Sequence, residues 1–135
     1  MLVRDLMSSE VTTLRRNDKL GAADDLMRLG RIRHLPILDE DGRLAGIVSQ
    51  RDLFHSGLVK ALGYGSHAQR HALATVTVKE AMTTDVVTTP PDAPLATAAR
   101  TMLERKIGCL VVVDGERLVG ILAESDFVKL AAREP

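Results

Sequence analysis

Ser49 and Asp52 combine residue types and a spacing that could bind a ligand at the start of a helix. A serine at that position lies beside backbone N–H groups and the positive end of the helix dipole, which suits a phosphate. An aspartate one turn later can accept hydrogen bonds from hydroxyl groups. The same pair also fits a capping box, a purely structural device. Taken alone it favours that interpretation, because short motifs often match by chance.

The region around this pair occurs twice in the chain. Residues 3–39 align with residues 78–114, and residues 43–54 align with residues 117–128. Ala123 stands where the first copy has Ser49. Many aligned residues are identical in collinear order, among them Leu20/Leu95, Met27/Met102, Gly46/Gly120 and Asp52/Asp126. The chain is therefore expected to contain two copies of one structural unit.

Both copies predict the same order of elements. The first is expected to hold a strand at 11–14, a helix from 20 to about 30, strands at 35–38 and 44–48, and a helix from 49. The second is expected to hold strands at 86–89, 110–113 and 118–122, with helices from 95 and from 124. Apolar residues at helical spacing predict two buried faces: Leu20, Ala23 and Met27, and Leu95, Ala98 and Met102.

Helix ends and turns are predicted from local residue types. Asn17 or Asp18 and Asp92 are predicted N-caps, Pro94 fits a first helical turn, and Gly30 fits a C-terminal stop. Turn-forming residues at 39–42 and 114–115 are expected to join the last two strands of each copy.

The element order β-α-β-β-α in each copy indicates an α+β fold. Neither copy looks large enough to cover its own sheet, so the two are expected to pack sheet to sheet with pseudo-twofold symmetry. The predicted division is repeat 1 at 1–58, a connecting helix or loop at 59–76, and repeat 2 at 77–135. The connecting segment suggests no function of its own.

Composition excludes several classes of protein. The 18 Lys and Arg residues balance 18 Asp and Glu residues, and with two Phe, one Tyr and no Trp there is little to stack on bases. This argues against nucleic-acid binding. No apolar run is long enough for a membrane helix, and the N-terminus lacks a signal pattern. A single cysteine excludes an intrachain disulfide, so a cytoplasmic protein is expected.

The repeat, the element order and the segment Gly46-Ile47-Val48-Ser49-Gln50-Arg51-Asp52 together resemble the cystathionine-β-synthase (CBS) domain family. The segments 11–13 and 34–39 add to the resemblance, as does the segment 3–7, which is echoed at 78–82. Nearly the whole chain is covered, as in a stand-alone tandem pair, or Bateman module. The resemblance implies a regulatory module that binds an adenosine-containing ligand, requires no cofactor, forms a homodimer and acts on an unknown regulated protein.

The resemblance also implies two composite nucleotide-binding clefts, each drawing on both repeats. Cleft one would combine Ser49, Arg51, Asp52, Thr88, Ile107, Gly108 and Cys109. Cleft two would combine Thr13, Ile32, Arg33, His34, Ser125 and Asp126. In this scheme each aspartate accepts hydrogen bonds from the ribose hydroxyls. Val and Ile side chains face adenine, and the strand glycine lets the ligand approach the backbone.

The two clefts depart from the family pattern in different ways. Cleft one has neutral Gly108 and Cys109 where the family often has phosphate partners, although Arg51 can compensate. Cleft two lacks the hydroxyl at Ala123 but gains Arg33 and His34, which favours ligands with several phosphates. The sequence leaves AMP, ADP, ATP, S-adenosylmethionine, a reduced nicotinamide dinucleotide and cyclic di-AMP open.

Two other functions compete with this hypothesis. A structural or dimerisation module without nucleotide affinity is favoured by Ala123, Gly108 and Cys109. Retention of both aspartates speaks against it. An enzyme is disfavoured because no nucleophile elbow, metalloprotease motif or phosphate-binding glycine loop is present, and no catalytic residue is assigned.

Two further features of the sequence favour ordinary structural roles. His67 and His71 have metal-ligand spacing but lack a third ligand, so no metal site is expected. Cys109 lies in an apolar strand, which predicts a buried, inert thiol.

Overall fold

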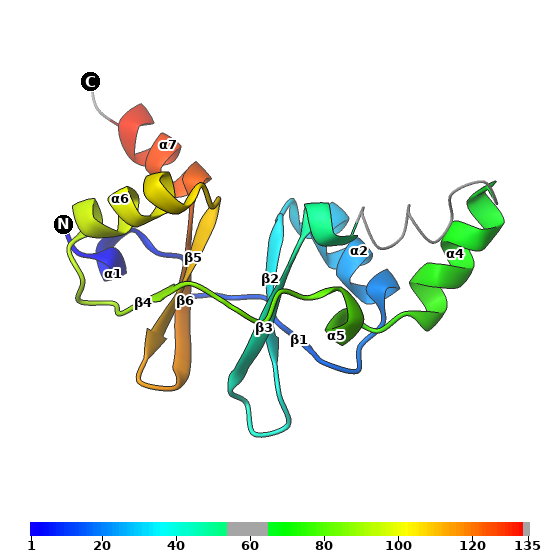
Figure 1. Ribbon diagram of the computed structural model, residues 1–135. Helices are drawn as coiled ribbons and strands as arrows, with labels where there is room; N and C mark the ends of the chain where they lie inside the picture. The colour runs from blue at the N-terminus through cyan, green and yellow to red at the C-terminus, as the bar shows by residue number, and fades with distance from the viewer. Residues whose placement is uncertain (54–64, 134–135) are drawn as a thin grey trace. The chain divides into compact units, whose positions relative to one another are not determined.

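Two small sheets of the same design carry all the strands of the computed structural model, which describes residues 1–53 and 65–133 (Figure 1). Their strands, in spatial order, are β1 (Leu14–Arg15), β2 (His34–Leu38) and β3 (Leu44–Ser49), and then β4 (Thr88–Thr89), β5 (Cys109–Asp114) and β6 (Arg117–Ala123). In each sheet the first pair of strands is parallel and the second is antiparallel. The predicted α+β class and the structural repeat are confirmed.

The first strand of each sheet is shorter than the sequence suggested. The strand expected at 11–14 forms only at Leu14–Arg15, and the one expected at 86–89 forms only at Thr88–Thr89. Both antiparallel pairs also carry an irregularity at the equivalent place, between Ile37 and Leu38 and between Val112 and Val113. The duplication therefore preserves even the local departures from a regular ladder.

The helices α2 (Leu20–Gly30) and α6 (Leu95–Arg105) bury the apolar faces that their periodicity predicts. Leu20 and Ala23 are completely buried, and the other four predicted residues are nearly so. Residues 50–53 are helical as well, and α7 (Glu124–Ala132) is their counterpart. Residues 54–58 of predicted repeat 1 and 59–64 of the predicted connection lie outside the described residues. The remainder of the connection contains all of α4 (Gly65–Thr75), which packs against α2.

The predicted N-caps are wrong. The cap residues are Lys19 for α2 and Pro94 for α6, and neither uses a side chain to bind the helix. The Leu20 N–H donates to the Val76 carbonyl at 2.9 Å, and the Leu95 N–H donates to the Met1 carbonyl at 2.9 Å. A backbone carbonyl from a distant segment thus satisfies the first of the N–H groups that have no acceptor within the helix.

The two residues that supply these carbonyl groups, Val76 and Met1, each lie just before a short helix that the sequence did not predict. The two short helices are α1 (Val3–Leu6) and α5 (Val78–Ala81), and Val3 and Val78 are completely buried. α1 contacts α6, α7 and β6, whereas α5 contacts β3. The leading segment of each repeat therefore packs onto the sheet and helices of the other repeat.

The contacts divide the chain into two compact units as a result. The first unit combines Met1–Val11 with Val86–Pro135, and the second is Thr12–Asp85. Each has its own apolar core, to which its short helix contributes. The division at 1–58, 59–76 and 77–135 follows the sequence period and stays a prediction.

The turn between β2 and β3 is built on Asp39, as the residue types predict. Its Oδ1 atom accepts hydrogen bonds from the N–H groups of Asp41 and Arg43, both at 2.9 Å. The bond from Arg43 holds the pKa of Asp39 below its usual value. Gly42 and Gly115 occupy the two turns with φ of 80° and 66°, a left-handed backbone that favours glycine.

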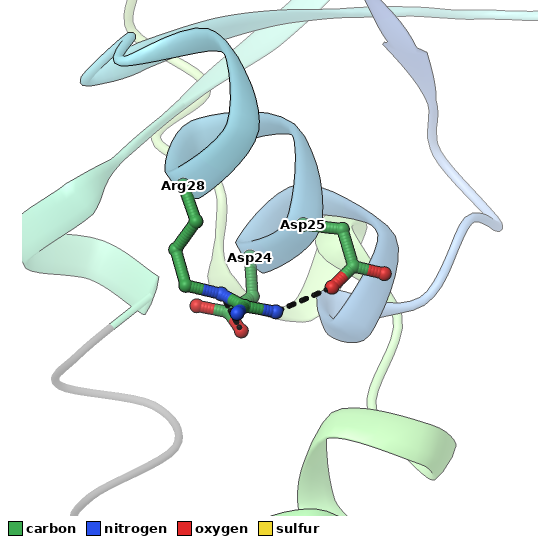
Figure 2. A network of polar contacts seen from close by, with 3 residues as sticks. All are labelled: Asp24, Asp25 and Arg28. Atoms are coloured by element: carbon green, nitrogen blue, oxygen red, sulfur yellow. Dashed lines mark hydrogen bonds and ion pairs between the residues drawn. The ribbon is translucent and has the colours of Figure 1, made fainter.

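The outer face of α2 carries a small charged network (Figure 2). Arg28 Nε lies 3.1 Å from Asp24 Oδ2, and Arg28 Nη2 lies 2.7 Å from Asp25 Oδ1. Such exposed pairs within one helix contribute only tenths of a kcal/mol each, about 0.3–0.5 kcal/mol, so they are accessory to the fold. No helix within residues 1–53 and 65–133 is long and apolar enough to cross a membrane.

Candidate functional site

In the second unit, Thr12–Asp85, the sheet brings predicted site residues of both clefts together. His34 opens β2 and is the register partner of Ser49, which closes β3. The chain turns into a helix directly after Ser49, and the Gln50 N–H donates to the Arg33 carbonyl at 2.8 Å. The Ser49–Asp52 segment of cleft one therefore adjoins the Ile32–His34 segment of cleft two.

The first unit repeats this arrangement with different side chains. Cys109 opens β5 and is the register partner of Ala123, which closes β6. The Glu124 N–H donates to the Gly108 carbonyl at 3.1 Å. Gly108 and Cys109 of predicted cleft one thus adjoin the start of α7, which carries Ser125 and Asp126 of predicted cleft two.

Ser49 and Asp52 form a complete capping box. The Ser49 N–H donates to Asp52 Oδ2 at 2.9 Å, and the Asp52 N–H donates to Ser49 Oγ at 3.0 Å. In α7 only the first of these bonds has an equivalent, from the Ala123 N–H to Asp126 Oδ2 at 2.8 Å, since alanine carries no hydroxyl. Each cap occupies one oxygen of its aspartate.

These bonds correct the expectation that the helix start offers open N–H groups to a phosphate. The N–H groups of Ser49, Gln50 and Asp52 already donate within the protein. The N–H groups of Ala123 and Glu124 do the same at the start of α7. A phosphate at the helix that follows β3 would therefore be held chiefly by side chains, whereas at α7 residue 123 has no hydroxyl that could accept the Asp126 N–H group.

Gly46 also has a different role from the one expected. An added Cβ atom would lie 2.7 Å from Met82 Sδ and 2.8 Å from the Thr83 carbonyl oxygen. Ile47 and Thr83 exchange two backbone hydrogen bonds of 2.9 Å, which hold that segment against β3. The close approach that Gly46 permits is therefore made by the chain's own backbone, where we had expected a ligand.

Gly120 repeats this contact in the first unit. Its added Cβ would lie 2.5 Å from Met7 Sδ and 3.0 Å from the Ser8 carbonyl oxygen. Met7 and Met82, which the sequence places at equivalent positions, pack against the two cores as expected.

The remaining predicted site residues differ in exposure. Arg33, Arg51, Thr88 and Ser125 are exposed, whereas Thr13, Ile32, His34, Ile107 and Gly108 are half-buried. Sequence reasoning missed the two residues that precede the site loops, Arg31 and Lys106. Both adopt the left-handed conformation, with φ of 53° and 55°, and cap α2 and α6. Glycine usually occupies the left-handed position at the end of a helix, so the sequence pointed to Gly30 and not to Arg31.

Cys109 is buried, as its apolar strand predicts. Burial, with a smaller contribution from the charge of Glu124, raises the pKa of the Cys109 thiol to about 12. The sulfur is therefore protonated at neutral pH, which disfavours nucleophilic chemistry. In the described part of the chain no group of three or more His, Cys, Asp or Glu residues could hold a metal ion. The side chain of His67 lies outside the described residues.

The unequal caps predict opposite effects of two substitutions on stability. Ser49→Ala is expected to lower the free energy of unfolding by about 1 kcal/mol, because the Asp52 N–H loses its acceptor. Ala123→Ser is expected to raise it by about 0.5–1 kcal/mol by completing the box with Asp126. Urea denaturation followed by circular dichroism measures both. Equal effects of the same sign would contradict the hydrogen-bond assignment.

The fold and the two equivalent sites define a tandem repeat of small α+β units with a capped aspartate at the start of a helix in each. Residues 3–58 and 78–133 match the family model of the CBS domain. The chain belongs to the CBS domain family. The resemblance on which the sequence interpretation depended is confirmed.

Solved structures of this family resemble the chain over nearly its whole length. A Vibrio cholerae protein described as AcuB, for acetoin utilization, is 41% identical with a TM-score of 0.79, and the match covers 98% of this chain and 90% of that one. A CBS domain pair in complex with 5′-methylthioadenosine and S-adenosyl-L-methionine is 31% identical (TM-score 0.80; 100% and 98% covered). CBSX2 in complex with AMP is 26% identical (TM-score 0.79; 98% and 96% covered).

Several curated relatives are much longer proteins. A homoserine O-acetyltransferase of Methanococcoides burtonii is 33% identical over 129 residues, which cover 95% of this chain but 24% of the relative. The chain spans about a quarter of the length of this relative and of others like it.

Proposed function

We propose that this protein is a regulatory module that binds an adenosine-containing ligand at the residues of the two predicted clefts and performs no catalysis. The observation that carries the proposal is the capped aspartate repeated in both units. One carboxylate oxygen of Asp52 accepts a hydrogen bond from the Ser49 N–H group, and one of Asp126 accepts a hydrogen bond from the Ala123 N–H group. These bonds fix the orientation of each carboxylate. The second oxygen can then accept hydrogen bonds from ribose hydroxyls.

The family relationship supports adenosine as the common part of the ligand. One related domain pair binds S-adenosyl-L-methionine and 5′-methylthioadenosine, and another binds AMP. These ligands share adenine and ribose but differ in charge at the 5′ position. Recognition by a fixed carboxylate and an apolar surface suits the shared part, so the side chains around the 5′ position would choose among them.

The exposed arginines supply that choice. In cleft one, where the N–H groups of Ser49, Gln50 and Asp52 are occupied, a 5′-phosphate would rely on Arg51. In cleft two the exposed Arg33 would supply the guanidinium. A guanidinium forms bidentate bonds with phosphate, so both clefts accept AMP, and cleft two, where His34 adjoins Arg33, suits ADP and ATP best. Gly108 and Cys109 leave cleft one less polar, which favours S-adenosylmethionine there.

Regulation requires that the ligand bind two conformations of the module with different affinity. The partner that reads the change would be a second copy in a homodimer, a separate cytoplasmic protein, or a domain joined to the module. A joined domain has a parallel among the longer relatives, because in them the matching region occupies only about a quarter of the chain. Their acetyltransferase activity is not proposed for this region.

Calorimetric titration with AMP, ATP, S-adenosylmethionine and 5′-methylthioadenosine tests the proposal. Saturable binding of at least one of them is expected, with up to two sites per chain. Flat titrations with all four, on protein whose folding is verified by a cooperative unfolding transition, would exclude the proposal. They would favour the alternative, a structural or dimerisation module, for which the complete Ser49–Asp52 cap is the supporting observation.

A further inference from the structure

Each unit contains a backbone hydrogen bond that joins parts of two different predicted clefts. In the second unit, Thr12–Asp85, the Gln50 N–H donates to the Arg33 carbonyl at 2.8 Å. Gln50 follows Ser49 of cleft one, and Arg33 belongs to cleft two. In the first unit the Glu124 N–H donates to the Gly108 carbonyl at 3.1 Å, with the roles of the clefts reversed. The duplication has therefore kept the bond although the side chains around it differ.

In the second unit this hydrogen bond joins the segment before β2 to the start of the helix after β3. Residues 31–33 form an irregular connection between the left-handed Arg31 and β2, held by the half-buried Ile32 on the core. The Arg33 carbonyl in turn holds the first N–H of the helix that carries Asp52. Gln50 lies between Ser49 and Asp52, so the position of its amide also sets the geometry of the capping box.

We infer that these two bonds couple the clefts, so that a ligand in one raises the affinity of the other. A ligand that contacts residues 32–34 orders the Arg33 carbonyl, and through Gln50 it orders the segment that presents Asp52. The segment that receives the second ligand is then already ordered, so the second binding step loses less conformational entropy. This is positive cooperativity without a large conformational change. This inference depends on the proposed function for its physiological meaning, but the coupling itself belongs to the protein without ligand.

A proline substitution isolates the bond. Proline at the first position of a helix is favourable, and it lacks an N–H group. The extended conformation of Ala123, with φ of −117° and ψ of 162°, is the one that a residue before proline prefers. Gln50→Pro and Glu124→Pro therefore remove one donor each without breaking the helix. The matched controls are Gln50→Ala and Glu124→Ala, which keep the N–H group.

The first experiment needs no ligand. Ile32→Ala removes the side chain that anchors residues 31–33, and amide hydrogen exchange at Asp52 is measured by NMR. Exchange is expected to accelerate at least about twofold in the wild-type and Gln50→Ala backgrounds, which is the lower range for groups in direct contact. In the Gln50→Pro background Ile32→Ala should leave exchange at Asp52 unchanged. An equal acceleration in the alanine and proline backgrounds would overturn the inference.

The second experiment uses AMP. Titration of the wild type and of the Gln50→Ala, Glu124→Ala double variant is expected to show two sites with a coupling factor of about 5 or more. The double proline variant should keep both sites but with a factor near 1. A factor that is the same in all three proteins would overturn the inference. Absence of AMP binding would count against the proposed function for this ligand, while the exchange experiment still decides the coupling.

Discussion

Gly46→Ala is expected to lower the free energy of unfolding by about 2 kcal/mol, as overpacking does at other close-packed sites. The new methyl group would meet the Thr83 carbonyl oxygen at 2.8 Å and Met82 at 2.7 Å. Thr83 cannot move away easily, because it exchanges two backbone hydrogen bonds with Ile47. Urea denaturation of the wild type and the variant measures the loss.

Two other glycines provide graded controls for this result. At Gly120 the nearest atom is the flexible end of Met7, and the nearest backbone oxygen is 3.0 Å away, so Gly120→Ala should cost less. At Gly30, the last residue of α2, only ordinary contacts with Ile32 at 3.6 Å or more would form. Gly30→Ala should be neutral or stabilising. If Gly46→Ala were no worse than Gly30→Ala, the close packing of residues 82–83 on β3 would be wrong.

Asp52→Asn is expected to weaken ligand binding in cleft one by roughly 10- to 100-fold while leaving the fold nearly as stable as before. The asparagine oxygen can still accept the Ser49 N–H, so the helix cap survives. Its NH2 group replaces the second carboxylate oxygen and donates where ribose hydroxyls need an acceptor. Losing hydrogen bonds to a charged group costs about 1.5–3 kcal/mol, which corresponds to the stated range. Calorimetry with AMP and S-adenosylmethionine measures the affinity.

The alanine variant separates the two roles of this residue. Asp52→Ala should lose both the cap and the ligand, so its unfolding midpoint should fall while that of Asp52→Asn stays close to the wild type. Asp126→Asn and Asp126→Ala form the matched pair for cleft two. Wild-type affinity in both asparagine variants would show that the aspartates serve the caps alone.

Sequence patterns predicted the parts of the fold that depend on local periodicity. The buried face Leu20, Ala23, Met27 and its counterpart follow from helical spacing, and the turn at Asp39 follows from residue types that bond their own backbone. The helix caps could not be predicted in this way. The Leu20 and Leu95 N–H groups bind carbonyls of Val76 and Met1, and no local pattern reports a partner so far along the chain.

The candidate site was predicted by position but not by the function of each group. Ser49 and Asp52 lie at a helix start as expected, and each binds the N–H group of the other, as the capping-box alternative predicts. The N–H group of Gln50 between them donates to the Arg33 carbonyl, a partner that only the fold brings there. Gly46 belongs to a recognisable motif, but only the packing of Met82 and Thr83 explains why the position excludes a side chain. Tertiary contacts decided both questions.

The exchange of leading segments limits how this chain can be divided or can evolve. A cut between residues 77 and 78 would leave each half with the opening helix that the other half needs, because Val3 is buried in the core of the first unit and Val78 in that of the second. A polypeptide of one repeat alone would lack one core helix and would carry another that does not belong to its own core. Only a second copy of the repeat could supply the missing helix. Neither copy can therefore be deleted from this chain without removing part of the other's interior.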